Sequence, residues 1–368
     1  MLKAGIVGLP NVGKSTLFNA LTNSYQAESA NYPFCTIEPN TGIVKVNDAR
    51  LWELQKITGT QKVIPAVFEF VDIAGLVRGA SKGEGLGNQF LANIREVDAI
   101  VHVIRCFEDE NIQHVENSVD PIRDLETIVL ELALADYGSI EKRLPRLEKS
   151  AKQNPEQKRE LELLKQVMPL LEAGQMISEH RSMFDAEDWA LLMKAGLLTT
   201  KPVIYAGNVA EDDLANPMGQ PLFATLAQRA SEEKRPIVAV SAQIEAELGA
   251  LEDEAEKLDY LASLGVEASG VDNLIVSTFG MLGLRTYFTA GEKEVRAWPF
   301  EEGYTAPQCA GVIHTDFEKG FIRAEVIAYA DYVEHQGEKG AKEKGLLRLE
   351  GKEYLVKDGD VMHFRFNV

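Results

Sequence analysis

The sequence has little cysteine, a shortage of basic residues and no long hydrophobic run, and each of these features excludes a class of protein. Only three of the 368 residues are cysteines, Cys35, Cys106 and Cys309, and their spacing matches no metal-ligand motif. A sparse, odd-numbered set of cysteines is typical of reduced thiols in the cytosol. We therefore expect all three to be core or loop residues.

Basic residues are outnumbered, with 38 lysine and arginine residues against 57 aspartate and glutamate residues and a net charge of −19. This balance argues against a protein that coats nucleic acid over a broad surface, because phosphate binding needs clustered cations. It does not exclude a local basic face. No DNA partner is expected.

No stretch of the sequence approaches the apolar length that crosses a bilayer. The first three residues lead directly into the first expected strand and leave no room for a signal peptide. We therefore expect a cytoplasmic protein without a membrane partner. The composition is ordinary for a globular protein, with 45% hydrophobic residues and a mean hydropathy of −0.14. A chain of 368 residues is too long for one core, so two or three domains are expected.

The most informative stretch is Gly8-Leu9-Pro10-Asn11-Val12-Gly13-Lys14-Ser15, in which four residues separate a glycine from Gly-Lys-Ser. This is the spacing of a phosphate-binding P-loop, and it lies between a short apolar strand and a helical pattern. Glycines let backbone N–H groups face a phosphate, and the helix start adds a positive dipole end. We expect Lys14 to reach the β- and γ-phosphates and the Ser15 hydroxyl to bind Mg²⁺. The other residues expected to line the nucleotide are Asn11, Val12, Gly13 and Thr16.

Two further elements complete the expected phosphate site. Asp72 and Gly75 follow an apolar strand pattern and form an Asp-x-x-Gly motif, in which the aspartate holds Mg²⁺ through water and the glycine N–H contacts the γ-phosphate. Thr36, in the polar loop before the second expected strand, is the candidate for a further Mg²⁺ ligand. Leu76 stands where many GTPases place the glutamine that orients water, and its side chain cannot hydrogen-bond. Another residue or a partner must therefore position the water.

His114 is the candidate for this catalytic role. It is one of six histidines and lies in an acidic loop that follows a buried strand expected over residues 99–104. The carboxyl ends of strands are where doubly wound sheets bind ligands. From position alone, a plain surface histidine is the alternative interpretation, and both remain open at this point.

The base-binding positions depart from the guanine-specific pattern. An expected strand ends in Asn208-Val209-Ala210-Glu211, where a GTPase carries Asn-Lys-x-Asp. The aspartate of that motif accepts hydrogen bonds from two guanine donors that adenine lacks, so the longer Glu211 removes the reason to prefer guanine. We expect Asn208 and Val209 to contact the purine, together with Ser241 and Ala242 in a second loop that lacks its usual lysine. These departures predict ATP rather than GTP.

Residues 122–198 show the apolar spacing of long, highly charged helices, which predicts a helical hairpin. Asn154-Pro155 is typical of a helix start, and Pro145 and Pro169 predict kinks or shifted helix ends. The hairpin is either purely structural or a docking arm. The basic residues of such an arm are Lys142, Arg143, Arg146, Lys149 and Lys152.

The last part of the chain, from about residue 283, has short alternating stretches that predict a small mixed sheet. Its basic residues form either an RNA-facing patch or an ordinary solvated edge. The residues of this candidate patch are Lys339, Lys342, Lys344, Arg348 and Lys352, five of the twelve basic residues in this part of the chain. The predicted fold class is α/β, with a nucleotide-binding domain at 1–121 plus 199–282, a helical insertion at 122–198 and a C-terminal domain at 283–368.

These motifs resemble those of the Obg-related P-loop proteins, and several stretches are similar to the YchF subfamily. The stretches that carry the resemblance are 5–19, 31–40, 72–77, 286–291, 314–321 and 357–361. The resemblance implies a P-loop NTPase domain, an inserted coiled-coil hairpin and a C-terminal TGS domain of the ubiquitin-like β-grasp type. It also implies an ATPase of GTPase ancestry, which agrees with Val209 and Glu211.

The same resemblance implies that His114 is a catalytic residue, because this group has an apolar residue where Leu76 stands; Lys14, from the P-loop motif, is the other expected catalytic residue. It further implies K⁺ stimulation through Asn11, and an association with the 70S ribosome or its 50S subunit that serves translation or stress responses. RNA contacts are expected through the TGS and helical domains. The alternatives are a GTPase and a nucleotide-gated adaptor whose hydrolysis is incidental.

Overall fold

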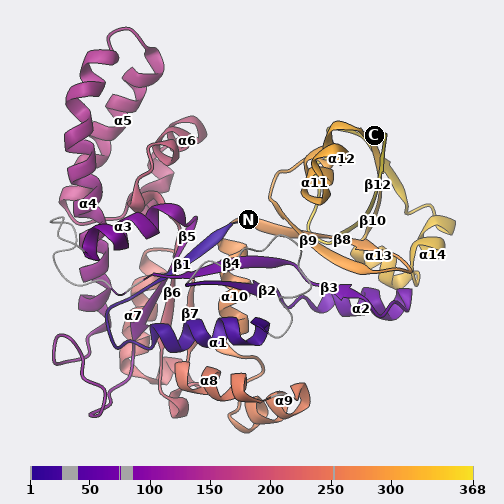
Figure 1. The fold of residues 1–368 in the computed structure, drawn as a ribbon, viewed down its shortest axis with the longest axis horizontal. Helices are drawn as coiled ribbons and strands as arrows, with labels where there is room; N and C mark the ends of the chain where they lie inside the picture. Colours follow the sequence, from indigo (N-terminus) through magenta and orange to yellow (C-terminus); the bar gives the residue numbers. More distant parts are fainter. Residues whose placement is uncertain (1, 27–39, 74, 76–85, 252, 368) are drawn as a thin grey trace. The chain divides into compact units, whose positions relative to one another are not determined.

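The computed structural model describes residues 2–26, 40–73, 75, 86–251 and 253–367, which fall into two compact units (Figure 1). The first unit comprises Met1–Ile43 and Glu69–Thr278, and the second comprises Val44–Phe68 and Phe279–Val368. No helix in these described ranges is long and apolar enough to cross a membrane. Cys106 and Cys309 are buried as expected, whereas Cys35 lies outside the described residues.

The first unit is built on a six-stranded sheet with the order β2-β4-β1-β5-β6-β7. The strands are β1 (Lys3–Val7), β2 (Thr41–Lys45), β4 (Val67–Asp72), β5 (Ala99–Arg105), β6 (Val203–Asn208) and β7 (Ile237–Val240). The pairs β1/β4, β1/β5, β5/β6 and β6/β7 are parallel. Every residue of β5 and β6 is buried, as expected for central strands that are covered on both faces. The carboxyl ends of these parallel strands therefore meet at one edge.

Helices follow most of these strands. They are α1 (Lys14–Gln26), α3 (Leu86–Glu96), α7 (Pro221–Glu232), α8 (Ala242–Ala250), α9 (Glu254–Ser263) and α10 (Gly270–Met281), with the short 3₁₀ turns η4 (Leu198–Thr200), η5 (Glu211–Asp213) and η6 (Pro217–Gly219). Glu245 of α8 is buried and accepts the N–H of Val271 at the start of α10. This contact satisfies one of the open N–H groups of the helix start.

The helical insertion contains α4 (Pro121–Ser150), α5 (Pro155–Glu172), η3 (Ile177–Met183) and α6 (Ala186–Lys194). Asn154 caps α5 as predicted, and its side chain accepts the N–H groups of Glu156 and Gln157. Pro145 and Pro169 lie inside the helices without ending them. In Figure 1, α4 and α5 run side by side as a hairpin, and they share a core with α6. The insertion belongs to the first compact unit rather than forming a unit of its own.

The second unit is a mixed sheet with the order β11-β10-β12-β8-β9-β3. Its strands are β3 (Val63–Ile64), β8 (Leu284–Ala290), β9 (Val295–Glu301), β10 (Phe321–Ala328), β11 (Arg348–Glu350) and β12 (Asp360–Phe366), and its helices are α2 (Ala49–Thr58), α11 (Ala306–Ile313), α12 (Thr315–Lys319), α13 (Tyr329–Glu334) and α14 (Glu338–Glu343). The β8–β9 hairpin is followed by α11, and β12 returns to pair parallel with β8. This is the β-grasp arrangement that was expected.

Residues 44–68 belong to the second unit, whereas the sequence-based boundaries placed them in the nucleotide domain. In the structure β3 pairs parallel with β9, and Arg50 of α2 lies 2.7 Å from Asp358. These pairings join chain segments more than 200 residues apart, as the Lys62–Glu294 pair shows with a separation of 232. No local sequence pattern records such long-range contacts, so the boundary prediction missed them.

Candidate nucleotide-binding site

The P-loop connects β1 to α1 and contains two positions that require glycine or favour it. A Cβ atom added at Gly8 would lie 2.7 Å from the carbonyl oxygen of Val103 in β5. Gly13 has a φ of 90°, in the left-handed region that favours glycine, and Asn11 has a φ of 61°. The Gly13 carbonyl accepts the N–H of Leu17 in the first turn of α1. The chain thus enters the helix in the way that directs backbone N–H groups toward an anion.

Lys14 and Asp72, the two charged residues of the expected phosphate site, form an ion pair. Lys14 begins α1 and is buried, while Asp72 ends β4 opposite Ile6 of β1. A buried ammonium group needs such a partner, since an isolated buried charge is costly. Ser15 follows on α1 and is exposed. An ammonium, a carboxylate and a hydroxyl group are therefore grouped where two adjacent strands end.

Gly75 lies against the P-loop. A Cβ atom added at Gly75 would stand 3.5 Å from the carbonyl oxygen of Gly8 and 3.7 Å from the backbone nitrogen of Pro10. The Asp-x-x-Gly motif thus adjoins the loop, as the sequence predicts. Thr36 and Leu76 lie outside the described residues, so their roles as Mg²⁺ ligand and as replacement for glutamine stay predictions.

Asn208 ends β6 and connects the P-loop to the second base loop. Its side-chain amide donates to the carbonyl of Val12 at 2.9 Å, and its side-chain oxygen accepts the N–H of Ala242 at 3.0 Å. The residue is 3% exposed, so these contacts satisfy polar atoms inside the protein. The sequence analysis expected this amide to contact a purine. In the structure it holds two loops together, and its contact with a purine stays a prediction.

The other residues expected to contact the base, Val209, Ser241 and Ala242, are buried, whereas Glu211 is exposed. Val209 is buried, and its N–H donates to the carbonyl of Val240 at 2.8 Å. Ser241 is buried, and its carbonyl accepts the N–H of Glu245 in α8. Glu211 is exposed at the start of η5. Residues 208–211, all of which are described, offer no short carboxylate of the kind that pairs with guanine.

Arg105 determines the shape of the loop that follows β5. It is 1% exposed, and its guanidinium donates to the backbone carbonyls of Phe107, Asp109 and Ile112 at 3.0, 3.3 and 2.9 Å. It also lies over the Phe107 ring, 4.5 Å from the centroid. A cavity of about 830 Å³ opens beside this loop and is lined by residues between Arg105 and Val119. One buried side chain therefore organises the whole loop.

The same loop touches the P-loop and carries His114 into the interior. The Asn11 side-chain amide donates to the Gln113 carbonyl at 3.0 Å. The next side chain, His114, is 3% exposed, with Nε2 2.8 Å from a carboxylate oxygen of Asp124 in α4. Its Nδ1 accepts the N–H of Glu116 at 3.1 Å. The interpretation of His114 as a plain surface histidine is therefore wrong, because a buried carboxylate binds the ring from the other side.

The sequence analysis missed Arg105 and Asp124. Arg105 is the charged end of a strand that is otherwise apolar apart from His102, and such a residue usually has an internal partner. Asp124 occupies a core-facing helical position together with Pro121, Leu125 and Ile128. An acidic residue within an apolar stripe was the signal that could have identified it.

The oxygen groups near the P-loop suit Mg²⁺. This ion prefers oxygen ligands and usually takes one or two from the protein, beside waters and substrate phosphates. Asp72 supplies a carboxylate beside the Lys14 ammonium, and Ser15, the next residue of α1, supplies an exposed hydroxyl group. Within the described part of the chain, no group of three or more His, Cys, Asp or Glu residues forms a metal site. The donor set therefore fits a cation that is shared with phosphate.

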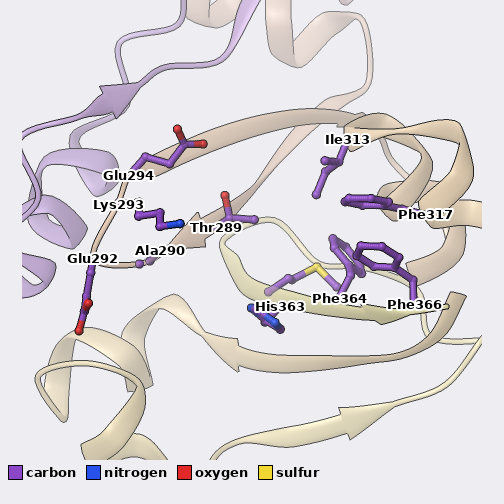
Figure 2. A pocket seen from close by; sticks show the side chains of 12 residues that line it. Thr289, Ala290, Glu292, Lys293, Glu294, Ile313, Phe317, His363, Phe364 and Phe366 are labelled. Carbon is purple, nitrogen blue, oxygen red and sulfur yellow. The ribbon is translucent and has the colours of Figure 1, made fainter. Parts of the chain in front are cut away.

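The second unit contains a separate cavity of about 480 Å³ (Figure 2). One end is apolar, and there the Phe317 and Phe366 rings stack with centroids 3.7 Å apart. The turn between β8 and β9 provides the polar end, with Lys293 and Glu294. The cavity lies wholly within the second unit and shares no residue with the nucleotide site.

The parallel sheet, the P-loop between β1 and α1 and the Lys14–Asp72 pair define a P-loop nucleotide-binding protein. Two family models match the chain. A model described as a 50S ribosome-binding GTPase matches residues 3–134, and the YchF-GTPase C-terminal model, described as a protein of unknown function, matches residues 284–367.

The chain belongs to the YchF family. It is 55% identical, over 100% of both chains, to the ribosome-binding ATPase YchF of Bacillus subtilis strain 168. It is 52% identical to the protein of the same name from Escherichia coli O157:H7, over 100% of this chain and 99% of that one. The solved structure of the Schizosaccharomyces pombe YchF GTPase covers 99% of this chain and 97% of its own, with a TM-score of 0.88 and 38% identity. The names of the two bacterial relatives thus state an ATPase, whereas the name of the S. pombe structure states a GTPase.

Proposed function

We propose that the protein is an ATP-hydrolysing P-loop protein that binds the ribosome in the cytoplasm and acts as a regulatory switch in translation or stress. The base loop carries the choice of nucleotide: the Asn208 amide is engaged by Val12 and Ala242, and Glu211 replaces the aspartate that pairs with guanine. The bacterial relatives named ribosome-binding ATPases support this choice at 55% and 52% identity.

In this proposal the P-loop stabilises the phosphates. The Lys14 ammonium, which now binds Asp72, turns to the β- and γ-phosphates when ATP enters. Ser15, Asp72 and Thr36 hold Mg²⁺, which neutralises phosphate charge when bound. The Gly75 N–H contacts the γ-phosphate. The other proposed nucleotide contacts are those of Asn11, Val12, Gly13, Thr16, Asn208, Val209, Ser241 and Ala242.

In the proposed reaction His114 positions or activates the attacking water. Leu76 stands where many GTPases have the glutamine for this task, and its side chain cannot hydrogen-bond to water. The Asn11–Gln113 hydrogen bond supports this role, because it places the loop of His114 against the P-loop. Asn11 is also the proposed contact for a stimulating K⁺ ion. Replacing KCl by NaCl at equal ionic strength tests that part and is expected to slow hydrolysis.

Competition binding and hydrolysis with ATP and GTP test the nucleotide. We expect ATP to bind at least about tenfold more tightly than GTP, a difference of about 1.4 kcal/mol. The double variant Val209→Lys, Glu211→Asp restores the guanine-specific residues and is expected to shift the preference toward GTP. Equal or tighter binding of GTP by the unaltered protein would favour the GTPase that the name of the S. pombe structure suggests.

Basic side chains at the end of the helical hairpin support the ribosome contact. Lys142, Arg146 and Lys149 on α4 are exposed, as is Lys152 in the turn after it. Arg143 is also exposed but pairs with Glu160. In a chain of net charge −19, such a local basic surface suits the phosphates of RNA. We propose this surface, together with Lys339, Lys342, Lys344 and Lys352 of the TGS domain, as the RNA contact; Arg348 is less available because it pairs with Asp360.

Co-sedimentation with 70S ribosomes and 50S subunits, in ATP, in ADP and without nucleotide, tests the switch. We expect the bound fraction to depend on the nucleotide and to fall in a Lys149→Glu, Lys152→Glu variant. The double variant Lys56→Glu, Lys234→Glu is the matched control, because both lysines are exposed and belong neither to the helical hairpin nor to the basic set of the TGS domain. Binding that is identical in all three nucleotide states would favour the adaptor with incidental hydrolysis.

A further inference from the structure

His114 has no ring nitrogen that is open to water. Its Nδ1 accepts the Glu116 N–H at 3.1 Å, so the ring proton resides on Nε2, which lies 2.8 Å from the Asp124 carboxylate. The side chain is 3% exposed. A general base must reach the proton that it removes, directly or through one water. In this arrangement the imidazole cannot act on a nucleotide-bound water.

Asp124 divides its two carboxylate oxygens between Arg123 and His114. Its side chain is 3% exposed in the first turn of α4, and one carboxylate oxygen accepts from the Arg123 guanidinium at 3.1 and 2.8 Å. The other oxygen faces His114. Within the described part of the chain, neither this oxygen nor His114 Nε2 has a hydrogen-bond partner, so their 2.8 Å approach is a close electrostatic contact without the alignment of a hydrogen bond. Arg123 satisfies only the first oxygen, so the imidazole is the polar group that the second, buried oxygen faces.

The turn that carries His114 can also reach the P-loop. The residue before it, Gln113, accepts the hydrogen bond of Asn11, while the His114 ring points toward α4. Residues 114–117 form a tight turn, closed by the Asn117 N–H on the His114 carbonyl, and Asn117 has a φ of 58°. The cavity of about 830 Å³ borders this turn. The turn at residues 114–117 is therefore the segment whose rearrangement would redirect the ring.

We propose that Asp124 is a positioning residue that holds His114 away from the nucleotide in the ribosome-free protein, and that hydrolysis requires the release of this contact. The proposal rests on the proposed catalytic role of His114. In a catalytic histidine–aspartate pair, the carboxylate binds one ring nitrogen and leaves the other open to the substrate. Here Glu116 occupies the second nitrogen and burial excludes water, so the contact retains the histidine rather than activating it.

The full-length variants Asp124→Ala and Asp124→Asn test the proposal through ATP hydrolysis without ribosomes. We expect Asp124→Ala to raise kcat by roughly tenfold with KM unchanged, because the released state becomes more populated. Asp124→Asn is expected to give a smaller rise, since the amide keeps an oxygen-sized polar group beside Nε2 and removes only the charge. Asp120→Asn is the matched control: it makes the same charge change at the N-cap of α4, where asparagine caps as well as aspartate, and is expected to leave kcat unchanged.

A second measurement uses the unaltered protein. Diethyl pyrocarbonate acylates accessible histidines, and mass spectrometry compares His114 with the exposed His363. We expect His114 to react at least about tenfold more slowly in the unaltered protein and at a similar rate in Asp124→Ala. If Asp124→Ala fails to fold, Asp124→Asn and this comparison decide the question.

Three results would overturn the proposal. The first is a folded Asp124→Ala protein with unchanged kcat, and the second is one with lowered kcat, which would make Asp124 the orienting partner of an active histidine. The third is rapid acylation of His114 in the unaltered protein. The underlying catalytic assignment fails separately, if His114→Ala hydrolyses ATP at the full rate. If His114→Ala lowers kcat while Asp124→Ala leaves kcat unchanged, His114 remains catalytic and only the proposed retention by Asp124 is wrong.

Discussion

At the scale of single residues, Asn208 shows how a position known for base binding also performs structural work. Its amide links Val12 of the P-loop to Ala242 at the start of α8, and all three groups lie in the interior. Removing one member of such a bridge leaves buried polar groups without partners, which costs more than the hydrogen bonds themselves contribute. The geometry of the phosphate site therefore depends on a side chain outside the P-loop.

We expect Asn208→Ala to lower the free energy of unfolding by about 1–3 kcal/mol, because the Val12 carbonyl and the Ala242 N–H lose their partner. Nucleotide affinity is expected to fall at the same time, since the P-loop loses its support. Urea unfolding and nucleotide titration measure the two effects. Asn216→Ala, at an exposed asparagine, is the control. An Asn208→Ala protein as stable and as tightly binding as the control would show that the bridge contributes little.

Glu245 gives a prediction about pH. Burial raises the pKa of Glu245 from 4.5 to about 7, against the opposing effect of hydrogen bonds from Gly270, Val271 and Ser269. Between pH 4.5 and 7 the folded protein thus binds more protons at this site than the unfolded chain does, and the stability that this site contributes is lost as the pH rises. The full effect is on the order of 3 kcal/mol.

Glu245→Gln is expected to flatten this part of the stability profile, which urea unfolding at several pH values between 4 and 8 measures. The control is Glu247→Gln on the same helix. Glu247 is exposed, and its hydrogen bond from Tyr260 lowers its pKa, so its contribution changes below pH 4.5 instead. If Glu245→Gln and the unaltered protein show the same slope between pH 4.5 and 7, the buried carboxyl does not titrate there.

At the scale of elements, Asp136 joins the helical insertion to the central sheet. It lies in α4, is 1% exposed and accepts three hydrogen bonds from η4, two from the Leu198 and Thr199 N–H groups and one from the Thr199 hydroxyl. The turn η4 leads directly into β6, which ends at Asn208. The base loop and the hairpin are therefore connected through one carboxylate.

We expect Asp136→Ala to lower the free energy of unfolding by about 1–3 kcal/mol, because it leaves buried donors of Leu198 and Thr199 unpaired. Glu141→Ala, at an exposed position of the same helix, is the control and is expected to change stability by less than about 0.5 kcal/mol. Chemical denaturation measures both. Equal stability of the two variants would mean that solvent replaces the carboxylate without loss.

Elements specified by local patterns could be predicted from the sequence, whereas contacts between distant elements could not. The P-loop spacing, the Asp-x-x-Gly motif and the Asn154 cap each depend on a few consecutive residues, and the structure has them where they were expected. The burial of His114 was not predictable in this way, because it depends on a carboxylate in a helix that begins seven residues later. The bridge made by the Asn208 amide was not predictable for the same reason, since its partners are 196 and 34 residues away.

At the scale of the whole molecule, the chain enters the second unit twice. Residues 44–68 leave the first sheet after β2 and contribute α2 and β3 to the second unit before the chain returns as β4. Leu51 and Leu54 of α2 are buried, and β3 pairs with β9. A division of the chain at residue 283, which the sequence suggested, therefore separates parts that fold together.

We expect a fragment of residues 1–282 to be less stable than the full protein, to bind a hydrophobic dye and to aggregate. Without β9 the strand β3 has no partner, and the buried side chains of α2 become exposed at about 1.5–3 kcal/mol each. A second fragment, in which a short Gly-Ser linker also replaces residues 47–65, is the matched control. The linker can span the gap because the Val46 N–H donates to the Ala66 carbonyl at 2.9 Å. Size-exclusion chromatography and thermal unfolding compare the two fragments. If both are monomeric and unfold at the same temperature, residues 44–68 do not depend on the C-terminal part for their fold.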